Sequence, residues 1–226
     1  MINADEVKNM VINLGAEDCG IANIERFAGA PHGFHPTDIY RDCKSVVVYL
    51  KSFPHGAVIA DNFIPYTHSS NVTFMELDHV GLSLCRKLQT KGIQAVMVPC
   101  DTPYEYWDAE KMRGMGILSM RHAGYLAGLG ILGKNTLLIN RRFGNMIYIG
   151  AVLANIDLEP DPLATDPVCP PNCRICIDAC PVRALDGVTV DQSKCRKYST
   201  AKTGRDYNVY VCNNCRKNCP HFQRGL

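Results

Sequence analysis

The sequence lacks any long apolar run and any export signal. No stretch of 18 or more apolar residues occurs among its 226 residues, which excludes a membrane-spanning helix. The N-terminus, MINADEVKNM, carries Asp5 and Glu6 and has neither the basic-then-apolar order of a secretory signal nor a twin arginine. We therefore expect a cytoplasmic protein with no membrane partner.

One glycine-rich stretch comes close to two nucleotide-binding motifs and lacks a necessary part of each. The stretch is AGLGILGKNTLLI, which begins at Ala127. A P-loop needs Ser or Thr after its lysine, where this chain has Asn135, and a Rossmann turn needs an acid about 20 residues onward, where Tyr148 stands. A helical pattern, not a strand, also precedes the glycines. The sequence thus predicts a structural turn between a helix and a strand, formed by Gly128, Gly130 and Gly133.

Cysteine is the residue type that the sequence has in excess. Eight of its twelve cysteines lie between Cys169 and Cys219. Without an export signal, this density indicates metal ligands instead of disulfides. The four scattered cysteines are expected to be small buried apolar side chains: Cys19, Cys43, Cys85 and Cys100.

The eight clustered cysteines follow the pattern of two-cluster ferredoxins. Two runs end in Cys-x3-Cys-Pro, and in such ferredoxins the last cysteine of each run ligates the other cluster. One [4Fe–4S] cluster would take Cys169, Cys173, Cys176 and Cys219, and the second would take Cys180, Cys195, Cys212 and Cys215. Paired Cys-x2-Cys units also suit structural zinc, but the two Cys-x3-Cys-Pro endings favour cubanes. The three-residue gap between Cys169 and Cys173 departs from the ferredoxin spacing, and we attribute it to an extra loop residue.

The charge of the cysteine-rich part fits the same hypothesis. Residues 165–226 hold ten Lys or Arg and five Asp or Glu, whereas the preceding residues carry an acidic surplus. A basic patch usually suggests nucleic acid or an acidic partner. However, a cubane with four thiolates carries about −2, so two clusters account for most of the surplus. Binding of nucleic acid is therefore not inferred from the basic residues.

An α+β fold is predicted for roughly the first 160 residues. One helix starts at the cap Asn3 and ends at Gly15, a longer one runs from the cap Asn71 to Gly92, and a third covers about 107–126. Strands are expected at 19–24, 44–51, 93–99, 135–140 and 145–154. Residues 156–171 hold five prolines and indicate a linker. We accordingly divide the chain into domains 1–158 and 159–226.

Several of these segments together resemble a known family. AGLGILGKNTLLI, the following FGNMIYIGAVL, then LEPD and the double-cysteine tail are similar to epoxyqueuosine reductases and to the reductive dehalogenases, most strongly from about His122 to Cys219. The resemblance implies a nitroreductase-like α/β sandwich followed by a small two-cluster ferredoxin-like domain. It also implies that the clusters deliver electrons to a cobalamin whose cobalt has no histidine ligand. In agreement, the corrinoid signature Asp-x-His-x-x-Gly is absent from the chain.

The resemblance also assigns roles to single residues. It places the glycine turn against the corrin, where side chains would obstruct, with contacts from Gly128, Gly130, Gly133, Lys134 and Asn135. Lys134 would contact a corrin amide or phosphate, or it is a surface cation. A catalytic aspartate of the family aligns with Asp101 in PCDTP. Tyr104 is a candidate proton donor near it, and Tyr106 and His122 lie in the same region.

The leading hypothesis is an oxygen-sensitive, cobalamin-dependent reductase. Epoxyqueuosine reductases continue into a helical-repeat domain that helps to hold tRNA, whereas this sequence stops at Leu226. We therefore expect a small-molecule substrate, no nucleic acid, and a redox protein as electron donor or acceptor. Two alternatives stay open. One is an electron-transfer protein without its own substrate, which reduces a partner enzyme or its corrinoid, and the other is a flavin-dependent reductase.

Overall fold

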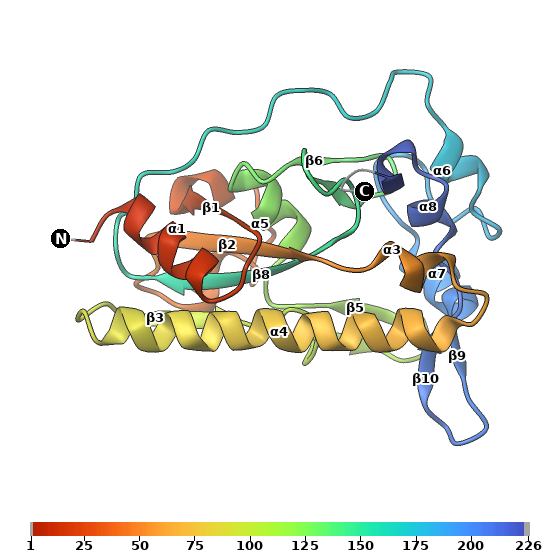
Figure 1. Cartoon of the computed structure of the whole chain (residues 1–226), viewed down its shortest axis with the longest axis horizontal. Helices are drawn as coiled ribbons and strands as arrows, with labels where there is room; N and C mark the ends of the chain where they lie inside the picture. Colours follow the sequence, from red (N-terminus) through yellow and green to blue (C-terminus); the bar gives the residue numbers. More distant parts are fainter. Residues whose placement is uncertain (1, 224–226) are drawn as a thin grey trace.

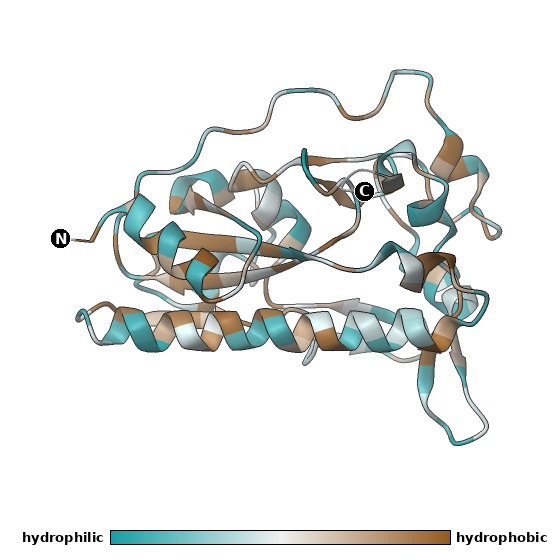
Figure 2. Ribbon diagram, viewed as in Figure 1, coloured by the Kyte–Doolittle hydropathy of each residue, from teal (hydrophilic) through white to brown (hydrophobic). Residues whose placement is uncertain are grey.

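A four-stranded antiparallel sheet forms the centre of the molecule, in the order β1-β2-β8-β3 (Figure 1). The computed structural model describes residues 2–223. The strands are β1 (Asp18–Asn23), β2 (Ser45–Ser52), β8 (Ile147–Ala154) and β3 (Ala95–Val98). The two central strands, β2 and β8, are apolar on both sides because the sheet is covered on both faces, and Figure 2 shows the resulting brown centre. The four strands predicted in these regions are confirmed.

Helices α1 (Ala4–Asn13) and α4 (Phe63–Gln89) cover one face of the sheet. The α1 helix begins as predicted, because the Asn3 side chain and the Glu6 side chain form a reciprocal capping box. The α4 helix was predicted to begin after Asn71 but begins at Phe63, where the side chain of Asn62 accepts a hydrogen bond from the backbone of Ile64 at 2.8 Å. Pro65 is compatible with this earlier start because an N–H in the first turn has no partner within the helix.

The opposite face is covered by shorter elements. They are η1 (Ile24–Phe27), α2 (Pro36–Ile39), α5 (Met120–Leu126) and the hairpin of β6 (Ile131–Leu132) with β7 (Leu138–Ile139). The strand predicted at 135–140 is therefore reduced to two residues. The predicted turn between helix and strand is confirmed for Gly128, which follows α5, and Gly130, which precedes β6, whereas Gly133 follows β6 and lies in the β6–β7 hairpin.

The helix predicted over about 107–126 is wrong for most of its length. Residues Tyr106–Asp108 and Arg113–Met115 instead form the antiparallel hairpin β4–β5, and only α5 is helical. The hairpin leaves little room for a side chain at Gly114, because a Cβ there would lie only 3.1 Å from the ring of Trp107 on the paired strand. Glycine is also unfavourable in a helix interior. The hairpin extends toward the cysteine-rich part of the chain.

A long extended segment connects β8 with the cysteine-rich part and arches over the sheet (Figure 1). Asp161 fastens this segment to the body: its carboxylate accepts hydrogen bonds from the Lys8 amine at 2.8 Å and from the backbone of Ile21 at 2.9 Å. The Arg26 guanidinium also donates to the Asp161 carbonyl oxygen at 2.7 Å. The segment therefore has a fixed point on the N-terminal body before the first clustered cysteine.

The cysteine-rich part consists of short elements packed against one end of the sheet. They are α6 (Ile175–Asp178), α7 (Gln192–Ser199), β9 (Thr200–Lys202), β10 (Asn208–Tyr210), α8 (Asn214–Lys217) and η2 (Pro220–Gln223). An apolar cluster joins this part to the body and to α3 (His55–Ile59) through Phe53, Val58, Tyr66, Met146 and Phe222. None of the described helices is both long and apolar enough to cross a membrane.

Candidate metal centres and the adjoining site

The eight clustered thiols are predicted to form two groups of four, although among residues 2–223 no three metal-ligating side chains lie close enough together to hold a single metal ion. The pKa of Cys176 is raised by burial and then by the charges of Cys219, Cys169 and Cys173. The pKa of Cys215 is raised to about 11 by burial, opposed by Arg216, and raised further by Cys195, Cys212 and Cys180. The thiols whose charges act on Cys176 and on Cys215 are therefore the other predicted members of the same group. The first group is Cys169, Cys173, Cys176 and Cys219, and the second group is Cys180, Cys195, Cys212 and Cys215.

The surroundings of both groups suit thiolate sulfur. A cavity of about 1100 Å³ is lined by all four thiols of the first group. The backbone N–H of Lys134 points at the sulfur of Cys169 at 3.5 Å, and that of Ala184 donates to the sulfur of Cys180 at 3.2 Å. All twelve cysteines are free thiols. Eight thiols in two sets of four match the donor set of two cubanes, and N–H donors to sulfur are among the features that set cluster potentials.

Lys134 and Asn135 lie between the two cysteine groups. The Lys134 amine donates to the carbonyl oxygens of Pro171 at 2.5 Å, Cys173 at 3.0 Å and Pro170 at 3.2 Å. The buried Asn135 amide donates to the carbonyl oxygen of Cys215 at 3.2 Å. These two residues therefore hold the loops that carry the ligands of both groups. Their predicted contact with a corrin stays a prediction.

The three glycines are accounted for by close approach of the chain to itself. A Cβ on Gly128, whose φ is +77°, would collide with the carbonyl oxygen of Pro162. A Cβ on Gly130 would collide with the carbonyl oxygen of Ile139, and one on Gly133 would lie 2.5 Å from the Ile139 side chain. Gly128 and Gly130 also line a groove of about 610 Å³ beneath the extended segment. Whether a corrin approaches them stays a prediction.

Asp101 and Tyr104 form a hydrogen-bonded pair beside the second group. The Tyr104 hydroxyl donates to the Asp101 carboxylate at 3.2 Å. Burial raises the pKa of Asp101, while the Tyr104 hydrogen bond and the charge of Arg196 oppose that rise. Burial also raises the pKa of Tyr104, and the charge of Asp101 adds to the effect. A carboxyl group that keeps its proton to higher pH, joined to a phenol, is suited to proton delivery.

Arg196 connects this pair to the cysteine-rich part and was not singled out from the sequence. Its guanidinium lies over the rings of Tyr104 and Trp107, 5.3 Å from each centroid. These two rings are stacked, with centroids 5.8 Å apart. Arg196 directly follows Cys195, a thiol of the second group. The only sequence signal was the position of the arginine next to a cluster cysteine, which does not reveal the partner across the fold.

Two other residues named from the sequence lie away from this pair's hydrogen bond. Tyr106 is exposed and donates to the carboxylate of Asp108 at 3.4 Å. The ring of His122 is hydrogen-bonded to the Ser119 hydroxyl at 2.7 Å, and burial lowers the pKa of this histidine. Both therefore have local partners within their own elements.

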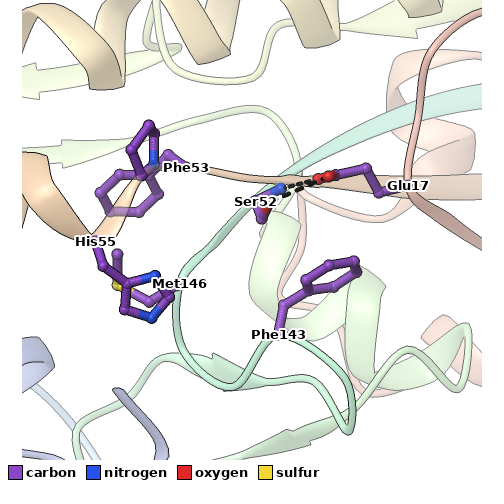
Figure 3. A pocket seen from close by; sticks show the side chains of 7 residues that line it. Glu17, Ser52, Phe53, His55, Phe143 and Met146 are labelled. Atoms are coloured by element: carbon purple, nitrogen blue, oxygen red, sulfur yellow. Dashed lines mark hydrogen bonds between the residues drawn. The ribbon is translucent and has the colours of Figure 1, made fainter. Parts of the chain in front are cut away.

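A further cavity of about 350 Å³ lies at the end of β2, beside the apolar contact between the two parts (Figure 3). Phe53, His55, Phe143 and Met146 line it, and Glu17 accepts hydrogen bonds from the backbone and the hydroxyl of Ser52 at one side. The His55 ring is within 2.6 Å of the carbonyl oxygen of Phe222. The polar groups Glu17, Ser52 and His55 are thus already hydrogen-bonded within the described part of the chain.

Comparison with known proteins places these features in context. No family model matches the chain. An epoxyqueuosine reductase of Staphylococcus aureus is 33% identical over 129 residues, which cover 53% of this chain and 33% of the relative. One of Atelocyanobacterium thalassa is 27% identical over 222 residues, which cover 86% of this chain and 64% of the relative. The chain is therefore similar in sequence to epoxyqueuosine reductases over part of their length.

Solved structures show that the fold of this epoxyqueuosine reductase-like chain is shared. An epoxyqueuosine reductase from Streptococcus thermophilus aligns over 98% of this chain and 67% of its own, with a TM-score of 0.69 and 20% identity. A catabolic reductive dehalogenase aligns over 97% of this chain and 32% of its own, with a TM-score of 0.73 and 19% identity. The predicted α+β class and the resemblance are confirmed. The alignment with the Staphylococcus aureus relative spans about a third of that protein.

Proposed function

We propose that this protein is an iron–sulfur reductase in which two [4Fe–4S] clusters pass electrons to a cobalamin beside Asp101 and Tyr104. The observation that carries the proposal is the contact of Arg196 with Tyr104, since Arg196 follows a thiol of the second group. An acid–phenol pair thus lies next to a predicted electron-transfer centre. Its similarity to epoxyqueuosine reductases, and to a reductive dehalogenase structure described in terms of B12-dependent dehalogenation, supports cobalamin as the electron acceptor.

Different residues of this chain would bind the clusters, fix the ligand loops and deliver the proton. The first and second cysteine groups would hold one cluster each, with the swapped assignment of Cys180 and Cys219. Lys134 and Asn135 would fix the ligand loops. Tyr104 would hold a proton at its hydroxyl, and Asp101 would replace it through their hydrogen bond. Cobalamin would supply the low-potential cobalt chemistry, as cofactors do in such enzymes.

The substrate is proposed to be a small reducible molecule. One structure of an epoxyqueuosine reductase contains an epoxyqueuosine-modified tRNA stem loop, so such a stem loop is the natural competing substrate. An aryl halide is a suitable small-molecule probe because a reductive dehalogenase shares the fold. Turnover of the stem loop, with none of the halide, would replace our substrate proposal by the tRNA reaction.

The test starts with anaerobic reconstitution and titration with cob(II)alamin. We expect about eight irons per chain, cobalt that stays with the protein through gel filtration, and a changed cobalt EPR spectrum. Asp101→Asn should keep iron and cobalt but lose turnover, whereas Glu105→Gln, at an exposed neighbouring acid, should behave as the parent. About four irons or stoichiometric zinc would overturn the two-cluster assignment, and a flavin spectrum would overturn the choice of cobalamin.

A second candidate function is an electron-transfer protein without a substrate of its own. The observation in its favour is that Trp107, stacked on Tyr104, is 46% exposed. An exposed aromatic side chain beside a redox centre is available to a partner protein. Clusters that form fully while cobalt is not retained would favour this candidate over the reductase.

A further inference from the structure

Arg216 is a buried cation beside the second cysteine group. It lies in α8 directly after Cys215, and only 6% of its surface is exposed. Its guanidinium lies over the rings of Phe53 at 4.9 Å and Tyr148 at 5.4 Å, and it donates to the carbonyl oxygen of Asn145. The Asn145 amide in turn donates to the Arg216 carbonyl oxygen at 3.0 Å. The position of this charge is therefore fixed from several sides.

Arg121 approaches the same thiol from the other side of the interface. It lies in α5, and its guanidinium donates to the carbonyl oxygen of Thr136 at 2.5 Å and to its hydroxyl at 2.8 Å. The neighbouring Asn135 donates to the carbonyl oxygen of Cys215 at 3.2 Å. Burial lowers the pKa of Arg121, the nearby charge of Arg216 lowers it further, and the charge of Cys215 opposes both effects. Helix α5 and the loop after β6, both in the body, thus lie close to helix α8 of the cysteine-rich part near Cys215.

Neither arginine has a carboxylate partner among residues 2–223, where every ion pair involves other side chains. Arg216 is buried and Arg121 is partly buried, and removing a cation from water without a counter-charge is unfavourable. Arg216 directly follows Cys215 in α8. Arg121 donates to Thr136, and the neighbouring Asn135 donates to the carbonyl oxygen of Cys215. The negative charge of a bound centre is therefore the natural counter-charge of this pair.

The cations near the first group are more exposed than Arg216. Arg174 is exposed and forms an ion pair with Asp178 at 3.4 Å. The Lys134 amine is hydrogen-bonded to backbone carbonyl oxygens at the surface of the loop. Charges in contact with water are screened, whereas buried charges act with little screening. A fixed, buried positive charge is thus found at the second group.

We infer that Arg121 and Arg216 raise the reduction potential of the centre held by Cys180, Cys195, Cys212 and Cys215. Reduction adds one negative charge to a cluster, and net charge and hydrogen bonding around the cluster set its potential. Buried cations stabilise the reduced form more than the oxidised form. The electron would therefore rest on the centre next to Arg196 and Tyr104. This inference rests on the proposed function, because it requires two clusters.

The test is an anaerobic redox titration followed by EPR, with dithionite as the one-electron donor; no bond or proton need change. Arg121→Gln and Arg216→Gln should each shift the second centre tenfold or more toward oxidation, which is 59 mV for a one-electron couple. The first centre should keep its potential. Cys180→Ala should lack the second centre, so the EPR signal that is missing from this variant identifies that centre. Arg174→Gln is the matched control and should change neither potential.

The outcomes separate the inference from the proposed function. An Arg121→Gln protein with about eight irons and an unchanged second potential would overturn the inference and leave the function standing. A shift of the first centre alone would overturn it as well. Parent protein that forms fewer than two cubanes would overturn the function and the inference with it. If Arg216→Gln does not fold, Arg121→Gln still tests the inference, because Arg121 is partly exposed. Arg216→Lys preserves the charge and should keep a potential near that of the parent.

Discussion

The guanidinium of Arg196 lies over the ring of Tyr104, 5.3 Å from its centroid, and brings a cluster cysteine next to the Asp101–Tyr104 pair. These residues are far apart in the sequence. The hairpin β4–β5 and helix α7 meet because the Gly114 backbone donates to the side chain of Gln192 at 3.1 Å. The contact between the hairpin and the helix therefore combines the hydrogen bond from Gly114 to Gln192 with the stacking of Arg196 on Trp107.

Loss of the Arg196 charge should raise the pKa of Asp101 further. Burial already raises this pKa, and Arg196 is one of the groups that oppose the rise. In Arg196→Gln we expect the carboxyl carbon-13 resonance of Asp101, identified by its absence in Asp101→Asn, to titrate at higher pH than in the parent. Lys197→Gln, at the exposed neighbouring position, should leave the titration in place. Equal titration in all three proteins would show that Arg196 does not act on Asp101.

Replacement of Asp101 by Asn should stabilise the protein at neutral pH. Because the folded-state pKa of Asp101 is raised, the contribution of this residue to stability is present below the unfolded-state pKa of about 3.9 and is lost as pH rises through the folded-state value. The Asn side chain does not titrate, so Asp101→Asn does not lose stability in this way as pH rises. We expect a gain of at most about 1 kcal/mol near pH 7, since the side chain is only partly buried.

Anaerobic urea unfolding between about pH 4 and about pH 8 measures this gain. The difference between Asp101→Asn and the parent should shrink toward the acidic end. Glu105→Gln provides the matched exposed acid and should show no comparable trend. A gain that is constant across this range would assign the effect to the hydrogen bond with Tyr104 instead of the charge.

Cys180→Ala should remove the second centre although Cys180 is closer in sequence to the first group. The expected content is about four irons per chain, with the EPR signal of the remaining cluster unchanged. Cys85→Ala, at a scattered and partly buried cysteine, should keep about eight irons. Loss of the first centre alone in Cys180→Ala would contradict the swapped ligand assignment.

Gly130→Ala should destabilise the body independently of any cofactor. The added Cβ would collide with the carbonyl oxygen of Ile139, and overpacking against backbone costs about 1–3 kcal/mol. Gly56→Ala is the matched control, because a Cβ there meets nothing within 4 Å. Denaturant unfolding of the two variants compares them directly. A stable Gly130→Ala protein that no longer retains cobalamin would instead support the predicted corrin contact.

The central sheet could be predicted from the sequence because its signals are local, whereas the assignment of the cysteines to two groups stays a prediction. Apolar β-branched runs such as Ser45–Ser52 have few alternatives, and Cys-x3-Cys-Pro endings constrain ligand identity. The start of α4 was mistaken because Asn71 and Asn62 are both plausible caps. The segment 107–126 was mistaken because the pairing of β4 with β5 is a tertiary choice that helical periodicity does not reveal.

The roles of the three arginines could not be predicted from the sequence. Arg121, Arg196 and Arg216 resemble the other basic residues of the chain until the fold shows what each contacts. Arg216 is buried, with its guanidinium over the ring of Phe53. The guanidinium of Arg196 lies over the ring of Tyr104. The connection between the surplus of basic residues and cluster charge stays a prediction, and the sequence does not say which of these residues are buried.

The hydrogen bonds of Asp161 to Lys8 and Ile21 limit how far Cys169, the first of the clustered cysteines, can move from the N-terminal body. Cys169 follows Asp161 by eight residues. An extended chain spans at most about 3.5 Å per residue, so Cys169 stays within roughly 28 Å of the anchor. Short tethers keep groups at millimolar effective concentration. Reassembly of a damaged centre should therefore be an intramolecular event, whose rate does not depend on the concentration of the protein.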